Sequence, residues 1–95
     1  MPIAAVFEFP SEDIAKYHSI TESDPRVVDQ PQRLSHVCFE TDGGWTVVDV
    51  WEDEDSFRAF GDILGPAAVA AGLEPKPSVY RVAGTITQDG KRESY

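Results

Sequence analysis

Two side chains with complementary acid–base chemistry lie in the middle of two β-type segments. His36 lies within residues 34–40, and Asp49 lies within residues 45–52. An imidazole whose tautomer and charge are set by a neighbouring carboxylate can act as a general base. The pair therefore predicts proton transfer. The alternative interpretation is a polar pair that satisfies its own hydrogen bonds inside a sheet, because buried polar groups must be satisfied whatever the function.

Aromatic and apolar residues near this pair could bind a small molecule. Trp51 and Trp45 could form walls of a concave, mostly apolar pocket, and Tyr17 belongs to a predicted helix that should cover the same face. The alternative interpretation of Trp51 is that it belongs to the core. Trp45, beside a predicted turn, could simply be half exposed.

Other reactive residue types have ordinary interpretations. His18 is expected to be a solvated surface imidazole, and Cys38 a small buried hydrophobe unless its pKa is depressed. Arg81 could orient a carboxylate or enolate, or form an outer salt bridge. The acidic run 52–55 is interpreted as a helix start rather than a metal site. We predict no metal site.

Length and charge narrow the possible function classes. Ninety-five residues with 41% hydrophobic content predict one globular domain over residues 1–84, followed by a polar tail over residues 85–95. Seventeen acidic against eight basic residues give a net charge of -9, which disfavours nucleic acid and anionic membranes as partners. The N-terminal residues lack the basic start of a signal peptide. With a single cysteine, the sequence indicates a cytoplasmic protein.

Hydrophobic periodicity predicts six elements in the order β-α-β-β-α-β. Strands are expected over residues 3–9, 34–40, 45–52 and 77–83, and helices over residues 11–22 and from about residue 53 to 71. Ser11 is expected to cap the first helix. Pro66 should kink or interrupt the second helix, and Gly72 should end it. Residues 23–33 have loop composition. This order is the split β-α-β pattern of ferredoxin-like α+β folds, with a four-stranded antiparallel sheet.

The two central strands form a predicted hairpin around Asp42-Gly43. Antiparallel pairing about this turn places four residue pairs on one face: Glu40 with Trp45, Cys38 with Val47, His36 with Asp49, and Leu34 with Trp51. The opposite face carries the apolar or small residues Ala4, Val6, Val37, Phe39, Thr46, Val48 and Val50. Both faces are thus largely apolar, although two helices can cover only one. We therefore expect a second copy of the chain to cover the other face in a two-fold homodimer.

The segment Asp49-Val50-Trp51-Glu52, followed by an acidic helix start and Phe57, carries a family resemblance. The chain resembles the dimeric α+β barrel superfamily and, in particular, its antibiotic biosynthesis monooxygenase-like branch. The segments Gly44–Glu52 and Leu64–Ala67 resemble small actinobacterial proteins of this type whose function is largely unassigned. The resemblance implies a ferredoxin-like subunit and a small-molecule cleft.

The resemblance also implies roles for particular residues. In the cofactor-free, quinone-forming members, the Trp that matches Trp51 lines the substrate cleft. Those members place an Asn and a Tyr where this chain has Val47 and Phe57, so the polar groups that hold a phenolic substrate are missing at these positions. Haem-degrading relatives need an axial His on the second helix, and this chain has none there. The resemblance therefore implies no cofactor.

These observations predict a homodimeric barrel that binds a small hydrophobic, aromatic or polyketide-like molecule. His36 and Asp49 are the candidate catalytic residues of an isomerase, a cyclase or a cofactor-independent monooxygenase. Trp51, Trp45, Tyr17, Phe57 and Val47 are the candidate substrate-binding residues. The alternatives are a dimer that binds a ligand without transforming it and a purely structural dimer with a closed core.

Overall fold

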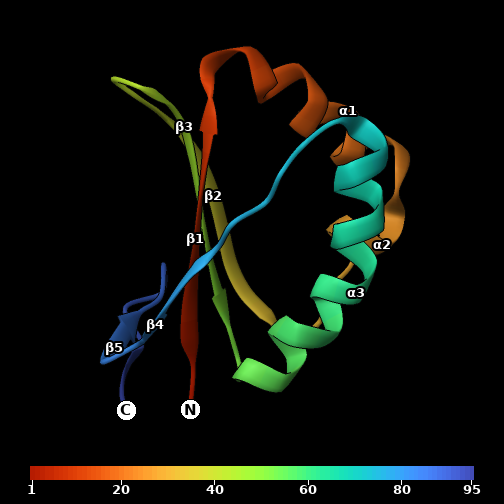
Figure 1. Ribbon diagram of the computed structural model, residues 1–95. Coiled ribbons are helices and arrows are strands. Elements are labelled where there is room, and N and C mark those ends of the chain that lie inside the picture. Colours follow the sequence, from red (N-terminus) through yellow and green to blue (C-terminus); the bar gives the residue numbers. More distant parts are fainter.

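A computed structural model describes all residues, 1–95 (Figure 1). Its elements in chain order are β1 (Ile3–Pro10), η1 (Ser11–Asp13), α1 (Ile14–Ser23), α2 (Pro25–Val28), β2 (Arg33–Thr41), β3 (Gly44–Trp51), α3 (Glu54–Ala71), β4 (Ser78–Arg81), β5 (Gly84–Ile86) and β6 (Arg92–Ser94). The first four strands form one antiparallel sheet in the order β2-β3-β1-β4. The predicted ferredoxin-like α+β class is confirmed.

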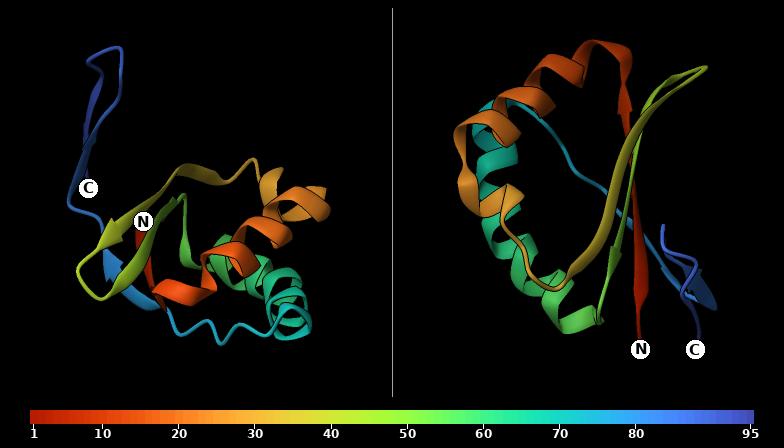
Figure 2. Two further views of the ribbon diagram at one scale, coloured as in Figure 1. Left: turned by 90° about the horizontal axis from the view of Figure 1, so that it is seen from above. Right: turned by 180° about the vertical axis from the view of Figure 1, so that it is seen from behind.

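The three helices all lie on one side of this sheet (Figures 1 and 2). We call that side the helix face and the other side the open face. Apolar side chains between the two layers form the buried core, which consists of Ile3, Ala5, Phe7, Ile20, Val27, Val47, Trp51, Phe60, Ala68 and Leu73. No helix is both long enough and apolar enough to span a bilayer.

The β2–β3 hairpin confirms most of the predicted register. Glu40 pairs with Trp45, Cys38 with Val47, and His36 with Asp49. Gly44, not Gly43, has the positive φ, and a Cβ on Gly44 would lie 2.0 Å from the backbone oxygen of Phe9. The backbone of β1 therefore lies too close to Gly44 for any residue with a side chain at this position.

The fourth predicted pair is wrong, because a β-bulge interrupts β2 between Arg33 and Ser35. Arg33, rather than Leu34, lies opposite Trp51, and Leu34 is exposed. An extra residue in one strand reverses the faces of everything beyond it. The bulge thus turns a cation toward the helix face at a position where simple alternation places a leucine.

Two features of the first helical region differ from the expectation. Ser11 makes no capping hydrogen bond, and residues 11–13 form a 3-10 turn before α1 begins. Within the predicted loop, a second short helix, α2, begins at Pro25. Asp24 precedes this proline and is therefore extended. That backbone ends α1, and the Asp24 carboxylate then caps α2.

The helix α3 runs without interruption through Pro66, so the predicted interruption there does not occur. Asp53 caps it by accepting a hydrogen bond from the Ser56 amide at 2.7 Å. Phe60 and Ala68, on either side of the proline, are both buried. We attribute the continuity to this packing, which compensates for the hydrogen bond that proline cannot donate. Gly72 ends the helix in the left-handed conformation, as predicted.

The tail that follows β4 is not irregular. The strands β5 and β6 pair as a separate hairpin, which extends from the sheet on the side away from the helices (Figure 2). Most of its residues are exposed. Hydrogen bonds from Val82 to Pro2 and from Tyr95 to Ala83 attach the base of the tail.

The open face carries exposed apolar side chains. Val37 and Phe39 on β2 are 52% and 41% exposed, and Tyr80 on β4 is 58% exposed. The pairing register places these residues on the same face as Val6 and Val48, which the sequence predicted for Val37 and Phe39. No segment of the chain covers this apolar surface in the way that the helices cover the other face.

Candidate functional site

A cavity of about 330 Å³ lies between the helices and the helix face. This volume is at the lower end of the range usual for small-molecule sites. Most of the lining residues are hydrophobic, and they come from β1, β2, β3, all three α-helices and the segment after α3. The lining consists of Phe7, Phe9, Tyr17, His18, Ile20, Thr21, Val27, Val28, Arg33, His36, Cys38, Val47, Asp49, Phe60, Leu64, Ala68, Leu73 and Pro75.

Three polar side chains in the cavity wall are joined by hydrogen bonds, and we call Tyr17, His36 and Asp49 the triad. The Tyr17 hydroxyl lies 2.5 Å from Nε2 of His36. Nδ1 of His36 makes a short hydrogen bond to Oδ1 of Asp49. Asp49 is only 2% exposed, whereas His36 and Tyr17 are partly accessible. The triad therefore runs from a buried carboxylate toward the opening.

The hydrogen bonds assign the proton positions in the triad. An ionised carboxylate can only accept, so Nδ1 of His36 carries a proton and donates it to Asp49. In a neutral imidazole, Nε2 is then the acceptor, and the Tyr17 hydroxyl donates to it. Cys38 also lies within hydrogen-bond reach of the Tyr17 hydroxyl, and the two lone pairs of that oxygen leave one for a molecule in the cavity.

Burial of the Tyr17 hydroxyl, with smaller contributions from the neighbouring Cys38 and then Asp49, raises its pKa to about 12. The phenol is therefore neutral and can donate its proton over the whole physiological range. The positive charge of Arg33 acts in the opposite direction and lowers this pKa. Arg33 is thus close enough to influence the triad electrostatically.

Arg33 lines the cavity because the bulge in β2 places its side chain on the helix face. Its guanidinium donates hydrogen bonds to the carbonyl oxygens of Val27 at 3.0 Å and Val28 at 2.8 Å. It also lies 5.8 Å from the ring centre of Trp51 and 5.6 Å from that of Phe60. Sequence reasoning missed this residue because it placed Leu34 on the helix face.

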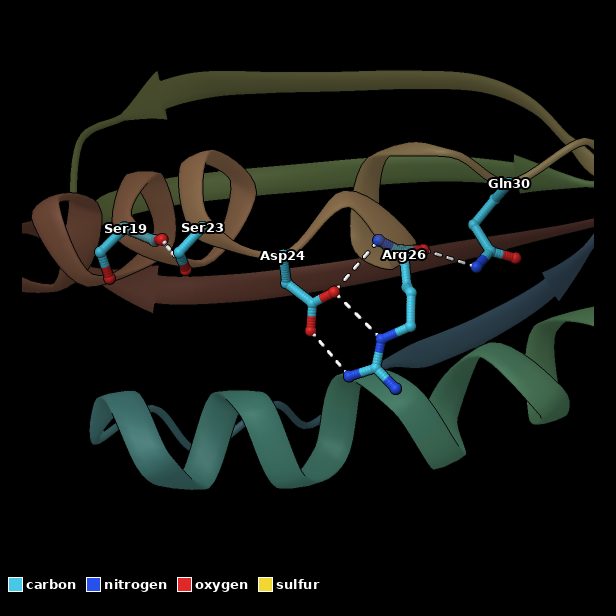
Figure 3. A network of polar contacts seen from close by, with 5 residues as sticks. All are labelled: Ser19, Ser23, Asp24, Arg26 and Gln30. Atoms are coloured by element: carbon cyan, nitrogen blue, oxygen red, sulfur yellow. Dashed lines mark hydrogen bonds and ion pairs between the residues drawn. The ribbon is translucent and has the colours of Figure 1, made fainter.

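The helix α2, which supplies both of these carbonyl oxygens, is held by a local polar network (Figure 3). The Asp24 carboxylate accepts from the Arg26 amide at 3.0 Å and pairs with its guanidinium at 2.9 Å. The Gln30 side-chain amide donates to the Arg26 carbonyl oxygen at 2.6 Å. These contacts cap the start of α2 and connect it to Gln30 just beyond its end, so they flank the two carbonyl oxygens that accept from Arg33.

The predicted substrate-binding residues divide into two groups. Tyr17 and Val47 line the cavity. Trp51 is fully buried beneath it, with its ring centre 4.9 Å from that of Phe60 and 5.9 Å from that of Phe57. Phe57 packs behind the cavity wall as well, and Trp45 is half-buried near the hairpin turn; neither lines the cavity.

Three secondary candidates are also located by the structure. His18 lines the cavity next to Tyr17, although it is exposed. Burial raises the pKa of the Cys38 thiol, which makes it a poorer nucleophile. Arg81 is exposed and does not line the cavity. Arg33 therefore takes the place in the cavity for which the sequence suggested Arg81.

No group of three or more His, Cys, Asp or Glu side chains comes together in a way that could hold a metal ion. The acidic run after β3 instead supplies Asp53 as the cap of α3 and two acids to its first turn. Besides the triad and Arg33, the polar side chains that line the cavity are those of His18, Thr21 and Cys38.

No protein-family profile matches the sequence, and no curated protein is significantly similar to it. Solved structures do share the fold. A mutant of SnoaB, a cofactor-independent oxygenase from Streptomyces nogalater, is 17% identical with a TM-score of 0.62, over 92% of this chain and 96% of that one. A monooxygenase from the gene ActVA-Orf6 of Streptomyces coelicolor, in complex with nanaomycin D, is 23% identical with a TM-score of 0.57, over 90% of each chain.

A conserved protein from Methanosarcina mazei is similar at 14% identity and a TM-score of 0.61, over 85% of this chain and 92% of that one. At these identities, the comparisons establish the fold. They confirm that this chain has the fold of these proteins, as the sequence resemblance implied.

Proposed function

We propose that this chain binds a small aromatic or polyketide-like molecule in the cavity and removes a proton from it without a cofactor. The observation that carries the proposal is the hydrogen-bonded triad in the wall of an otherwise apolar cavity. Apolar walls bind the body of such a molecule, and a few convergent polar groups orient it. The fold shared with a cofactor-independent oxygenase supports the same proposal.

The proton would move along the triad. A ligand O–H or acidic C–H group gives its proton to the Tyr17 oxygen while the Tyr17 proton passes to Nε2 of His36. The imidazole becomes an imidazolium, and the buried Asp49 carboxylate stabilises that charge through Nδ1. Tyr17 therefore ends the step neutral, in agreement with its high pKa.

The resulting ligand anion has two possible fates. Reaction with dioxygen at a CH₂ group activated by two rings gives a ketone and one water, so that both oxygen atoms are accounted for. Return of the proton to another atom gives an isomerisation or a cyclisation. We favour oxygenation because SnoaB and the ActVA-Orf6 protein, which share this fold, are oxygenases.

Anthrone is a suitable probe, because its activated CH₂ group is oxidised to anthraquinone with uptake of one dioxygen and release of one water. We expect the protein to accelerate oxygen uptake, and we expect His36→Ala to abolish the acceleration. Asp42→Asn, in the exposed hairpin turn, is the control and should keep it. Equal rates for the wild type and His36→Ala would refute the proposed proton transfer.

The main alternative is a protein that binds a ligand without transforming it. The cavity supports this reading as well as the catalytic one. The two are separated by Asp49→Asn, which should cripple proton transfer but leave apolar binding nearly intact. A purely structural role with a closed core is less compatible with a lined cavity of this volume.

The proposal includes a homodimer formed through the open face, in a cytoplasmic protein with one free thiol. The exposed Val37, Phe39 and Tyr80 support it, because a two-fold axis lets one apolar patch cover itself. The C-terminal hairpin extends on the same side (Figure 2) and could reach the second copy. Sedimentation equilibrium should give twice the chain mass of 10.5 kDa, and Phe39→Lys should give the monomer.

A further inference from the structure

Arg33 is the only Lys or Arg residue that lines the cavity. The chain has eight Lys and Arg residues, and five of them form ion pairs: Lys16, Arg26, Arg58, Lys76 and Lys91. Arg33, Arg81 and Arg92 have no carboxylate partner, although acidic residues outnumber basic ones by about two to one. Of these three, Arg33 alone lines the cavity.

The guanidinium of Arg33 is held in place but keeps free donors. Its hydrogen bonds to the carbonyl oxygens of Val27 and Val28 use two of five N–H groups. The other three have no protein partner. Nε of Arg33 makes no hydrogen bond and is not among the fully buried atoms. Arg33 therefore lines the cavity with N–H donors that no protein group occupies.

The surroundings of Arg33 favour an anion over a neutral group. The rings of Trp51 and Phe60 lie within 6 Å of the guanidinium, so little water screens its charge on that side. Asp49, the acidic residue in the cavity lining, is already paired with His36. A positive charge in an apolar wall without a counter-ion is a site that a ligand anion can neutralise.

We propose that Arg33 binds a carboxylate carried by the ligand of this cavity, so that the ligand class is an aromatic carboxylate. The inference rests on the proposed function, because it needs a small aromatic molecule in the cavity. A guanidinium presents parallel N–H groups that match the two carboxylate oxygens. With the carboxylate at Arg33, the apolar body would lie between Phe7, Val47 and Leu64, with one edge at the triad.

The test compares 2-naphthoate with its neutral isostere, 2-naphthamide, by isothermal titration calorimetry. We expect the wild type to bind the carboxylate at least about tenfold more tightly than the amide. Arg33→Gln should remove this preference and leave the affinity for the amide within about twofold. The matched control is Arg81→Gln, which removes an exposed, unpaired arginine outside the cavity and should behave as the wild type.

Because Arg33 packs on Trp51, Arg33→Gln could lose affinity simply by unfolding, and a second variant controls for this. Arg33→Lys keeps the charge but loses the planar fork, so we expect an intermediate preference. Equal binding of acid and amide by the wild type, or an undiminished preference in Arg33→Gln, would overturn this inference and leave the cavity proposal standing. Binding of neither compound to the wild type would overturn both proposals.

Discussion

The space between the sheet and the helices has a packed end and a hollow end, and β3 contributes to both. Trp51 fills the packed end and is fully buried against Phe57 and Phe60. Two residues earlier on the same strand and the same face, Asp49 enters the hollow end, where it meets His36 and the cavity. Because residues two apart in a strand lie on the same face, β3 supplies both Trp51, which packs beside the site, and Asp49, which belongs to the triad.

The difference between the two ends shows how a chain of 95 residues can keep a cavity open. The large aromatic rings at the packed end supply the burial that stabilises the layers. The hollow end instead carries polar groups whose hydrogen bonds satisfy one another. We therefore expect substitutions at the packed end to affect stability and substitutions at the hollow end to affect binding and catalysis.

The largest expected effect is on stability, from Trp51→Ala. Removing a fully buried indole leaves a cavity and should lower the free energy of unfolding by about 3–5 kcal/mol. Trp45→Ala, at a half-buried position near the turn, should cost clearly less. Urea denaturation of both variants checks this. Similar losses for the two variants would mean that Trp51 is not the centre of the packed end.

The second effect is on activity, from Asp49→Asn at the hollow end. The amide cannot stabilise an imidazolium as the carboxylate does, so we expect anthrone oxidation to slow by about 100-fold. Asp42→Asn makes the same chemical change in the exposed turn and should leave the rate unaltered. Steady-state oxygen uptake compares them. A rate for Asp49→Asn within threefold of the wild type would remove the triad from the mechanism.

The third effect is a pH dependence of stability that arises from Tyr17. Its pKa is about 12 in the folded protein and about 10 in the unfolded chain. The unfolded state thus loses this proton first, so the stabilisation is complete below pH 10 and is lost as the pH rises toward 12. The free energy of unfolding should fall more steeply across this range for the wild type than for Tyr17→Phe. Parallel curves would contradict the raised pKa, and Tyr80→Phe, at an exposed phenol, is the control.

The smallest effect concerns Cys38, which lies opposite Val47 at the hollow end and lines the cavity. Burial raises the pKa of its thiol, so at pH 8 it should react with iodoacetamide more slowly than a free thiol such as glutathione. Mass spectrometry over time gives the rate. Faster alkylation than that of glutathione would indicate an activated thiol and a different chemistry for the cavity.

Much of this comparison could be predicted from the sequence. The Asp42-Gly43 turn fixed the pairing of His36 with Asp49 by simple counting. The alternation of residues also assigned Trp51 to the helix face and Val37 to the open face. Local periodicity was sufficient here because each strand is regular around the turn and has one register that buries its apolar side chains.

The rest could not be predicted, because it depends on contacts that are distant in sequence. The bulge that exposes Leu34 and brings Arg33 to Trp51 breaks the alternation without a glycine to mark it. The hydrogen bond between Tyr17 and His36 depends on how α1 packs over the sheet. The division into packed and hollow ends is equally a property of side-chain volumes in three dimensions. Trp51 belongs to the packed end, and for this reason it is buried and does not line the cavity.

The most direct test of the account is the tautomer of His36, measured by ¹⁵N–¹H correlation of the imidazole at a pH where it is neutral. We predict a proton on Nδ1, held by Asp49, and an unprotonated Nε2 that accepts from Tyr17. The His36 signals should also shift when 2-naphthamide is added, because the ring lines the cavity. A proton on Nε2, together with signals that do not respond to the ligand, would contradict the central claim that this triad serves the cavity.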